Sequence, residues 1–150
     1  MSTRRKFLRQ FPSLLAVPLL VSQEGKAETL SGPFRRFSAN DQINLACIGM
    51  GIQGFNDVNA ALGNPGIKMV AACDLYDGRL AWAREVYGED IFVTRDYREI
   101  LSRKDVDAVI VGTSDHWHDT ITIAALDAGK HVYCEKPLVQ SLDEGHAVLE

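Results

Sequence analysis

Short apolar runs alternate with amphipathic stretches along residues 43–150. The runs are rich in small and β-branched side chains, as expected of strands buried on both faces of a parallel sheet. These predicted strands cover residues 43–48, 67–73, 91–93, 106–111 and 131–134. Helices are predicted between them at residues 53–62, 78–87 and 120–128. Strands that alternate with helices indicate right-handed βαβ units, so we predict an α/β fold, a doubly wound parallel sheet in the order βαβαβαβαβα.

Two more helices are indicated by residues with capping-box spacing. Asp96 and Glu99 precede a short helix that is predicted to run to Leu101, with Asp in place of the usual Ser or Thr. Ser141 and Glu144 have the same spacing and are predicted to open a helix that continues to the last residue.

The first 42 residues follow a different pattern. Residues 3–9, Thr-Arg-Arg-Lys-Phe-Leu-Arg, are similar to the twin-arginine export signal, and a short apolar stretch follows at residues 11–21. That stretch is too short to span a bilayer, which takes roughly 20 apolar residues. We therefore expect a cleaved signal peptide at residues 1–27, an irregular linker at 28–42, and export to the periplasm. The alternative is an ordinary amphipathic N-terminal arm.

Charge is distributed unevenly along the chain. The formal net charge is −4, yet residues 1–27 hold five Lys or Arg against one Glu. The remainder is therefore clearly acidic. Because phosphate binding needs clustered basic residues, we expect no nucleic-acid partner, and we expect membrane contact only through the export signal.

The three cysteines, Cys47, Cys73 and Cys134, all lie in predicted strands, and their spacing matches no metal motif. We expect buried small hydrophobes, with a disulfide pair or a reactive thiol as the alternatives. His116 and His118 have no third ligand near them in the sequence, so we expect no metal site.

A glycine-rich turn follows the first predicted strand and opens the first predicted helix. Gly49, Gly51 and Gly54 form the pattern G-x-G-x-x-G, in the context that supports a dinucleotide-binding turn. The first glycine permits the turn, the second lets a pyrophosphate approach, and the third lets the helix pack on the strand. The amides of Ile52, Gln53 and Gly54 would then face the phosphates at the positive end of the helix.

An acid stands where this turn would need one. Asp74 ends the second predicted strand, 20 residues beyond Gly54, where a carboxylate accepts hydrogen bonds from the adenosine ribose. A carboxylate repels a 2′-phosphate, so NAD is favoured as the cofactor. NADP stays possible, because Arg79 is close enough in sequence to reach such a phosphate.

Two loops follow the fourth and fifth predicted strands, near the nicotinamide end of the crevice. In the first loop, Thr113, Ser114 and His116 are expected to contact the cofactor, and Trp117 and His118 are candidates for the substrate side. The second loop has the sequence Cys-Glu-Lys-Pro-Leu at residues 134–138.

With these motifs the sequence resembles the Gfo/Idh/MocA oxidoreductase family, over residues 43–150. The resemblance rests on the glycine turn, on the loop at residues 113–118 (similar to T-P-x-H-x-H), and above all on A-G-K-H-V-Y-C-E-K-P at residues 128–137. Ser114 stands where the family usually has Pro, which makes that loop less rigid. The cofactor assignment does not depend on this position.

The resemblance implies specific roles around the nicotinamide. The lysine of E-K-P corresponds to Lys136, which would lie beside nicotinamide and substrate and handle a proton at a sugar oxygen. Glu135 would orient this lysine or contact the cofactor ribose, and Pro137 would fix the backbone, often through a cis bond in this family.

The function implied is hydride transfer between NAD and a sugar or polyol. Because an exported protein meets no free NAD pool, we expect tightly bound, recycled cofactor. The alternatives are a redox-neutral NAD-dependent glycosidase and a non-catalytic dinucleotide-binding module. Family members continue with a second α/β domain that holds the substrate pocket and the homo-oligomer interface, so we expect the domain to be incomplete at residue 150 and inactive alone.

Overall fold

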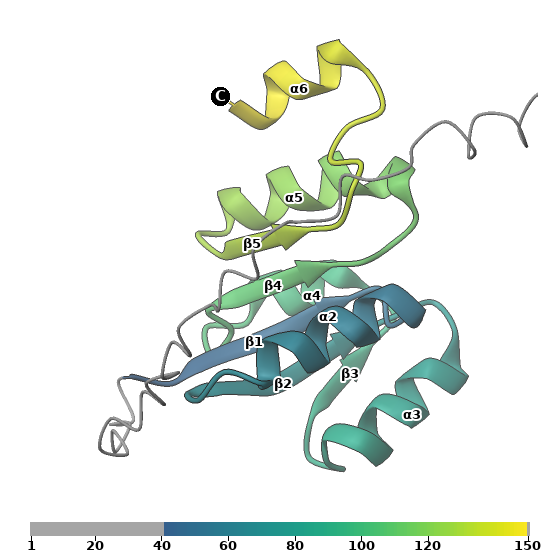
Figure 1. The fold of residues 1–150 in the computed structure, drawn as a ribbon, viewed down its shortest axis with the longest axis vertical. Coiled ribbons are helices and arrows are strands. Elements are labelled where there is room, and N and C mark those ends of the chain that lie inside the picture. Colours follow the sequence, from purple (N-terminus) through teal and green to yellow (C-terminus); the bar gives the residue numbers. More distant parts are fainter. Residues whose placement is uncertain (1–40, 150) are drawn as a thin grey trace, which may run out of the picture. The chain divides into compact units, whose positions relative to one another are not determined.

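The computed structural model describes residues 41–149, so the expected signal peptide and nearly all of the linker lie outside the described residues. Five parallel strands form one sheet in the order β3-β2-β1-β4-β5 (Figure 1). The strands are β1 (Ile43–Ile48), β2 (Ile67–Cys73), β3 (Phe92–Thr94), β4 (Ala108–Val111) and β5 (His131–Cys134). The helices are α2 (Ile52–Leu62), α3 (Asp77–Tyr87), α4 (Tyr97–Ser102), the 3₁₀ helix η2 (Asp115–Trp117), α5 (His118–Asp127) and α6 (Leu142–Leu149).

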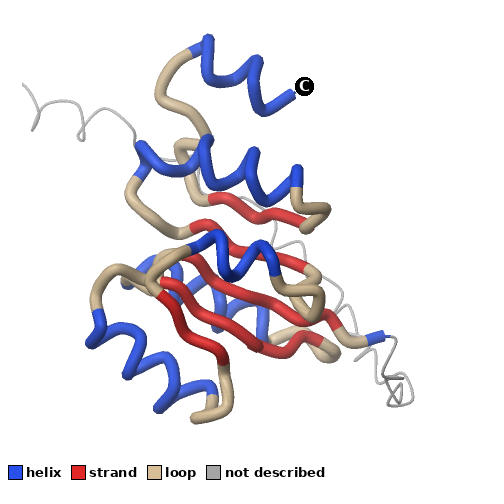
Figure 2. Tube along the Cα trace, turned by 180° about the vertical axis from the view of Figure 1, so that it is seen from behind, coloured by secondary structure: helices blue, strands red, loops and turns tan. Residues whose placement is uncertain are grey.

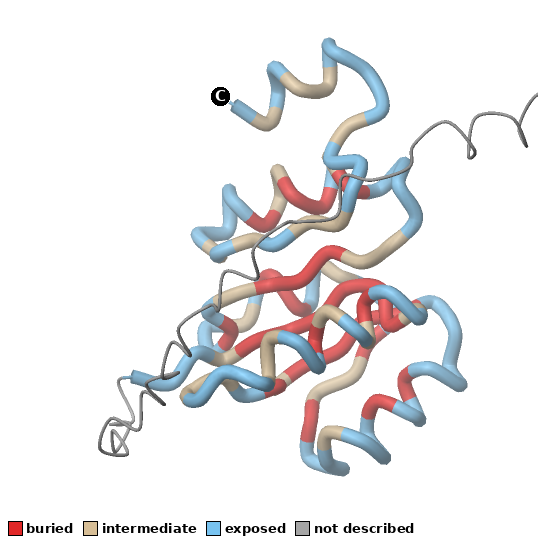
Figure 3. The backbone as a smooth tube through the Cα atoms, in the orientation of Figure 1, coloured by how far each residue is buried: buried red, intermediate tan, exposed pale blue. Residues whose placement is uncertain are grey.

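Each face of the sheet has its own apolar core. Alternate side chains of β1 point to opposite faces, so Leu45 and Cys47 pack with Val58 of α2 and Ala83 of α3. On the other face, Ala46 and Ile48 pack with residues of α4 and α5. Helices therefore cover both faces, as predicted for a doubly wound sheet (Figure 2). The buried residues are concentrated in β1, β2 and β4 (Figure 3).

The predicted α/β fold is confirmed, and the differences lie at element boundaries. The fourth strand begins two residues later than predicted. Val106 is buried in the core, but the hydrogen-bond ladder with β1 starts only at Ala108. The predicted helix at 120–128 begins earlier, because η2 leads directly into α5 at His118.

The two predicted capping boxes differ in their hydrogen bonds. In α6 the box is reciprocal: Glu144 N donates to Ser141 Oγ, and Ser141 N donates to Glu144 Oε2 at 3.3 Å. In α4, Asp96 accepts from the backbone of Arg98, but Glu99 accepts from the Thr94 hydroxyl at 2.7 Å. The Thr94 hydroxyl in turn accepts a hydrogen bond from Asp96 N. In α4 the Thr94 side chain therefore links Asp96 N to Glu99, in place of the direct hydrogen bond of a capping box.

The cysteines behave as small apolar side chains. Cys47 and Cys73 are buried, and all three thiols are free. Burial raises the pKa of Cys73 to about 12, which makes the reactive thiolate rare near neutral pH. No helix between residues 41 and 149 is long and apolar enough to cross a membrane.

Candidate dinucleotide-binding site

The glycine turn is packed so tightly that two of its glycines are required by sterics. Gly49 has a φ of +95°, and a Cβ there would lie 2.6 Å from the backbone of Gly112 and Thr113. A Cβ on Gly54 would overlap the carbonyl oxygen of Gly49. The turn, the start of α2 and the end of β4 therefore meet backbone to backbone.

Gly51 is different, because a Cβ there would make only ordinary van der Waals contacts. Its backbone is extended, and the nearest atoms to a Cβ would belong to the Arg79 guanidinium at 3.8 Å. The N-terminus of α2 has no side-chain cap and no acidic residue in its first turn. The amides of Ile52 and Gln53 thus lack intrahelical acceptors, at the positive end of the helix. Such free amides fit a pyrophosphate.

Asp74 lies at the end of β2 and is only 8% exposed. Its Oδ2 accepts from Met50 N at 2.8 Å, and its Oδ1 accepts from Tyr76 N at 2.9 Å. Arg79 Nη1 lies 3.3 Å from Oδ2. A carboxylate has about four acceptor positions, so one stays open for a ribose hydroxyl.

A crevice of about 500 Å³ opens at the carboxyl ends of β1, β2 and β4. This is the point where the strand order reverses, since β1 lies between β2 and β4. Ligands of open α/β sheets bind at such a switch point. Five of the predicted site residues line it: Gly49, Asp74, Thr113, Ser114 and Trp117.

The adenosine side of the crevice also holds three arginines, of which only Arg79 was indicated by the sequence pattern. Arg79, Arg95 and Arg98 line it, and each is paired with an aspartate. Arg98 also stacks on Tyr97, 4.6 Å from the ring centroid. Their signal in the sequence is weak, because arginine after a strand is common on solvated surfaces.

The loop after β4 brings only part of its predicted set into the crevice. His116 is exposed beside Asp115 and is not among the residues that line the crevice. His118, expected on the substrate side, is instead 2% exposed. Its ring nitrogens face the carbonyl oxygens of Thr113 and Pro137, so the enclosed ring is not available to a substrate.

The loop after β5 is connected to α2 through side chains. Gln53 Nε2 lies 3.4 Å from Glu135 Oε1, which also accepts from the Tyr133 hydroxyl at 3.2 Å. Glu135 Oε2 accepts from Lys136 N, which fixes the backbone of the lysine. Lys136 is exposed, and no described residue pairs with its ammonium group. The Lys136–Pro137 bond is cis, as the resemblance implied.

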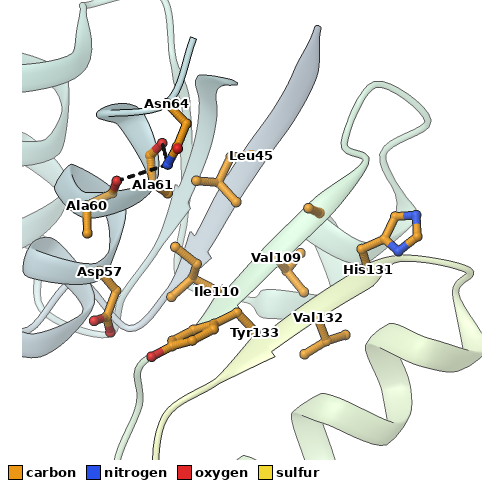
Figure 4. A pocket seen from close by; sticks show the side chains of 11 residues that line it. Leu45, Asp57, Ala60, Ala61, Asn64, Val109, Ile110, His131, Val132 and Tyr133 are labelled. Carbon is orange, nitrogen blue, oxygen red and sulfur yellow. Dashed lines mark hydrogen bonds between the residues drawn. The ribbon is translucent and has the colours of Figure 1, made fainter. Parts of the chain in front are cut away.

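A second groove, of about 450 Å³, lies on the α2 side of β4 and β5 (Figure 4). Its floor is apolar and includes Leu45, Ala108 and Ile110. Asp57 lies at one end, and its Oδ2 is buried without a hydrogen-bond partner among the described residues. Burial raises the pKa of Asp57; the hydrogen bond from Gln53 opposes the shift, and nearby Glu135 adds to it.

Sequence reasoning missed two structural contributors to the site. Gly112 directly follows β4, and a Cβ on it would lie 2.9 Å from Gly54 Cα. Its position directly after a strand, like that of Gly49, was the available signal. The contact from Asp74 to Met50 N left no sequence signal. Between residues 41 and 149, no three His, Cys, Asp or Glu side chains gather as a metal ion requires.

The strand order, the turn and the crevice define a dinucleotide-binding Rossmann domain. The family model described as oxidoreductase family, NAD-binding Rossmann fold, matches residues 43–150. The chain belongs to this family, Gfo/Idh/MocA, which the sequence motifs had indicated, and NAD is its cofactor.

Relatives and solved structures agree with this assignment. The chain is 35% identical over 110 residues to inositol 2-dehydrogenase of Salmonella typhimurium, covering 72% of this chain and 32% of that protein. It is 30% identical over 122 residues to a glycosyl hydrolase family 109 protein of Shewanella baltica, covering 73% and 26%. Scyllo-inositol dehydrogenase from Lactobacillus casei, solved with NAD(H) and scyllo-inositol, matches with a TM-score of 0.65 at 29% identity, covering 71% and 32%. The chain thus spans about a third or less of the length of these relatives.

Proposed function

We propose that this chain is the cofactor-binding part of an NAD-dependent oxidoreductase that acts on a sugar or polyol by hydride transfer. The single observation that carries the proposal is the crevice at the switch point, which joins the glycine turn, Asp74 and the loop after β4. The names of the relatives, inositol dehydrogenases among them, support a polyol as the substrate class.

The residues of this chain bind and orient in this proposal. The free amides at the start of α2 hold the pyrophosphate, and Asp74 accepts from the adenosine ribose. Nicotinamide supplies the hydride acceptor when it is bound. Lys136, whose ammonium pairs with no described residue and whose backbone nitrogen donates to Glu135, holds a proton at the reacting sugar oxygen.

We propose further that the protein is exported and keeps its cofactor. The support is the twin-arginine pattern at residues 3–9, which lies outside the described residues. A protein that released NADH outside the cytoplasm would stop after one turnover, so bound cofactor has to be regenerated within each cycle. Expression of the natural gene product, followed by cell fractionation and N-terminal sequencing, tests the export. Periplasmic protein that begins at Glu28 supports it, and cytoplasmic protein with an intact N-terminus contradicts it.

The cofactor experiment is direct. The natural gene product is purified without added nucleotide and denatured, and the released small molecules are identified by mass spectrometry. Near-stoichiometric NAD(H) supports a retained cofactor. Protein without nucleotide that binds NADH on titration is an exchangeable dehydrogenase, and protein that fails to bind NADH contradicts the proposal.

A redox-neutral glycosidase is the second candidate, favoured by the similarity to the glycosyl hydrolase family 109 protein. Transient oxidation followed by reduction would give net hydrolysis without net change in NAD. Assays of glycosides and free polyols separate the two: hydrolysis without accumulation of NADH indicates the glycosidase, and NADH formation from a polyol indicates the dehydrogenase.

A further inference from the structure

The imidazole of His118 lies between two loops of the site. This residue begins α5 and is 2% exposed, while the other three histidines are exposed. Its Nδ1 lies 2.7 Å from the carbonyl oxygen of Pro137, and its Nε2 lies 3.0 Å from the carbonyl oxygen of Thr113. Both distances are those of good hydrogen bonds.

The chemistry of the two partners restricts what the ring does. Carbonyl oxygens only accept hydrogen bonds, so each ring nitrogen has to carry hydrogen to serve its partner. Both bonds are complete when both ring nitrogens are protonated. A buried polar ring without partners would destabilise the core, whereas here both of its nitrogens have acceptors.

Each carbonyl belongs to a backbone segment with a place in the site. Thr113 follows Gly112, whose backbone is packed against the glycine turn at Gly49 and Gly54. Pro137 follows Lys136 directly. The ring is therefore a short bridge from the wall of the cofactor crevice to the backbone beside the lysine.

We propose that His118 is a positioning residue that clamps the Lys136 loop to the Thr113 loop, and so sets the distance between the proton-handling lysine and the nicotinamide. The meaning assigned to Lys136 rests on the proposed function, whereas the clamp itself rests on the two bonds. One bond orders the loop after β5, and the other orders the loop after β4.

Two substitutions separate the two ends of the clamp. The amide nitrogen of Asn lies close to the place of Nδ1, and that of Gln lies close to the place of Nε2. His118→Asn therefore keeps the bond to Pro137, and His118→Gln keeps the bond to Thr113. The full 150-residue chain of each variant is compared with the unsubstituted chain by hydrogen–deuterium exchange over residues 112–117 and 134–139.

A crossed pattern is expected. Exchange over 134–139 rises about tenfold in His118→Gln and less than about twofold in His118→Asn, as for the loss of one hydrogen bond. Over residues 112–117 the effects are reversed: hydrogen exchange rises about tenfold in His118→Asn and less than about twofold in His118→Gln. Equal changes in both segments in both variants would show a merely structural ring and overturn the proposal.

A measurement on the unsubstituted chain covers the case of variants that do not fold. A ring N–H of His118 is expected to give a slowly exchanging NMR signal, because the ring is buried and bonded to a carbonyl oxygen. Absence of any slow ring N–H signal overturns the clamp. Neither readout uses NAD or catalysis, so failure of the clamp and failure of the proposed function are seen separately.

Discussion

Asp74 Oδ2 accepts a hydrogen bond from the backbone nitrogen of Met50 at 2.8 Å. The carboxylate expected to bind the cofactor ribose therefore also holds the glycine turn that is expected to bind the pyrophosphate. Met50 is 1% exposed, so its amide has no access to water as a substitute partner. One buried side chain thus joins the ends of β1 and β2.

Asp74→Ala is expected to destabilise the fold by about 2–4 kcal/mol, because two backbone amides lose their acceptors and one of them is buried. Urea unfolding of the chain without nucleotide measures this loss. The control is Asp77→Ala, whose carboxylate pairs only at the exposed surface with Arg95 and is expected to change stability by less than about 1 kcal/mol. Equal losses in the two variants would contradict a structural role for Asp74.

The glycine turn gives a matched pair of alanine substitutions. Gly54→Ala is expected to cost about 3 kcal/mol or more, because the new methyl group overlaps the Gly49 carbonyl and backbone has to move. Gly51→Ala is expected to change stability by about 0.5 kcal/mol or less, since its backbone is extended and a Cβ there would make only ordinary van der Waals contacts. NADH affinity should nevertheless fall about tenfold or more in Gly51→Ala, by fluorescence titration. Unchanged affinity would place the pyrophosphate elsewhere.

Asp74 and Arg79 together are expected to decide between NADH and NADPH. The unsubstituted chain should bind NADH at least about tenfold more tightly, because the carboxylate repels a 2′-phosphate. Asp74→Ser should increase the affinity for NADPH relative to NADH, since Arg79 loses its carboxylate partner and becomes free to bind the 2′-phosphate. Adding Arg79→Gln to this variant should remove the increase in NADPH affinity. A gain in NADPH binding that survives Arg79→Gln would assign it to Arg95 or Arg98.

The buried oxygen of Asp57 predicts a pH-dependent effect on stability. The folded state raises the pKa of this carboxyl above its ordinary 3.8, mainly through burial. The stability that this carboxyl contributes is therefore present below pH 3.8, and it is lost as the pH rises through the pKa of the folded state. Asp57→Asn is expected to raise the melting temperature at neutral pH, by on the order of 2 °C, and to lose this advantage in acid.

Asp105 is the control with the opposite sign. Its hydrogen bond with Arg103 lowers its pKa, so its contribution is present above the ordinary value and is lost as the pH falls through the folded one. Asp105→Asn should lower the melting temperature at neutral pH. If the melting temperatures of Asp57→Asn and Asp105→Asn shift in the same direction at neutral pH, the charge environments assigned to these carboxylates are wrong.

The fold could be predicted from the sequence, and so could the placement of Gly49 and Asp74 at the ends of neighbouring strands, both for local reasons. Strand alternation, glycine spacing and the distance from Gly54 to Asp74 are features of continuous segments. The boundaries of α5 and β4 were less accurate, because a 3₁₀ turn and a core residue outside the ladder carry no distinct pattern. His118 was misplaced for another reason. Its partners lie 5 and 19 residues away, and only the folded loops bring both carbonyls to one ring.

The strand that leads to Lys136 lies at an edge of the sheet. Among the described residues β5 pairs with β4 alone, so its outer row of backbone amides and carbonyls is open to another extended segment. A segment that added there by β-augmentation would lie alongside the backbone that carries the lysine. Assembly at this edge and the placement of the proton-handling group would then respond to the same event.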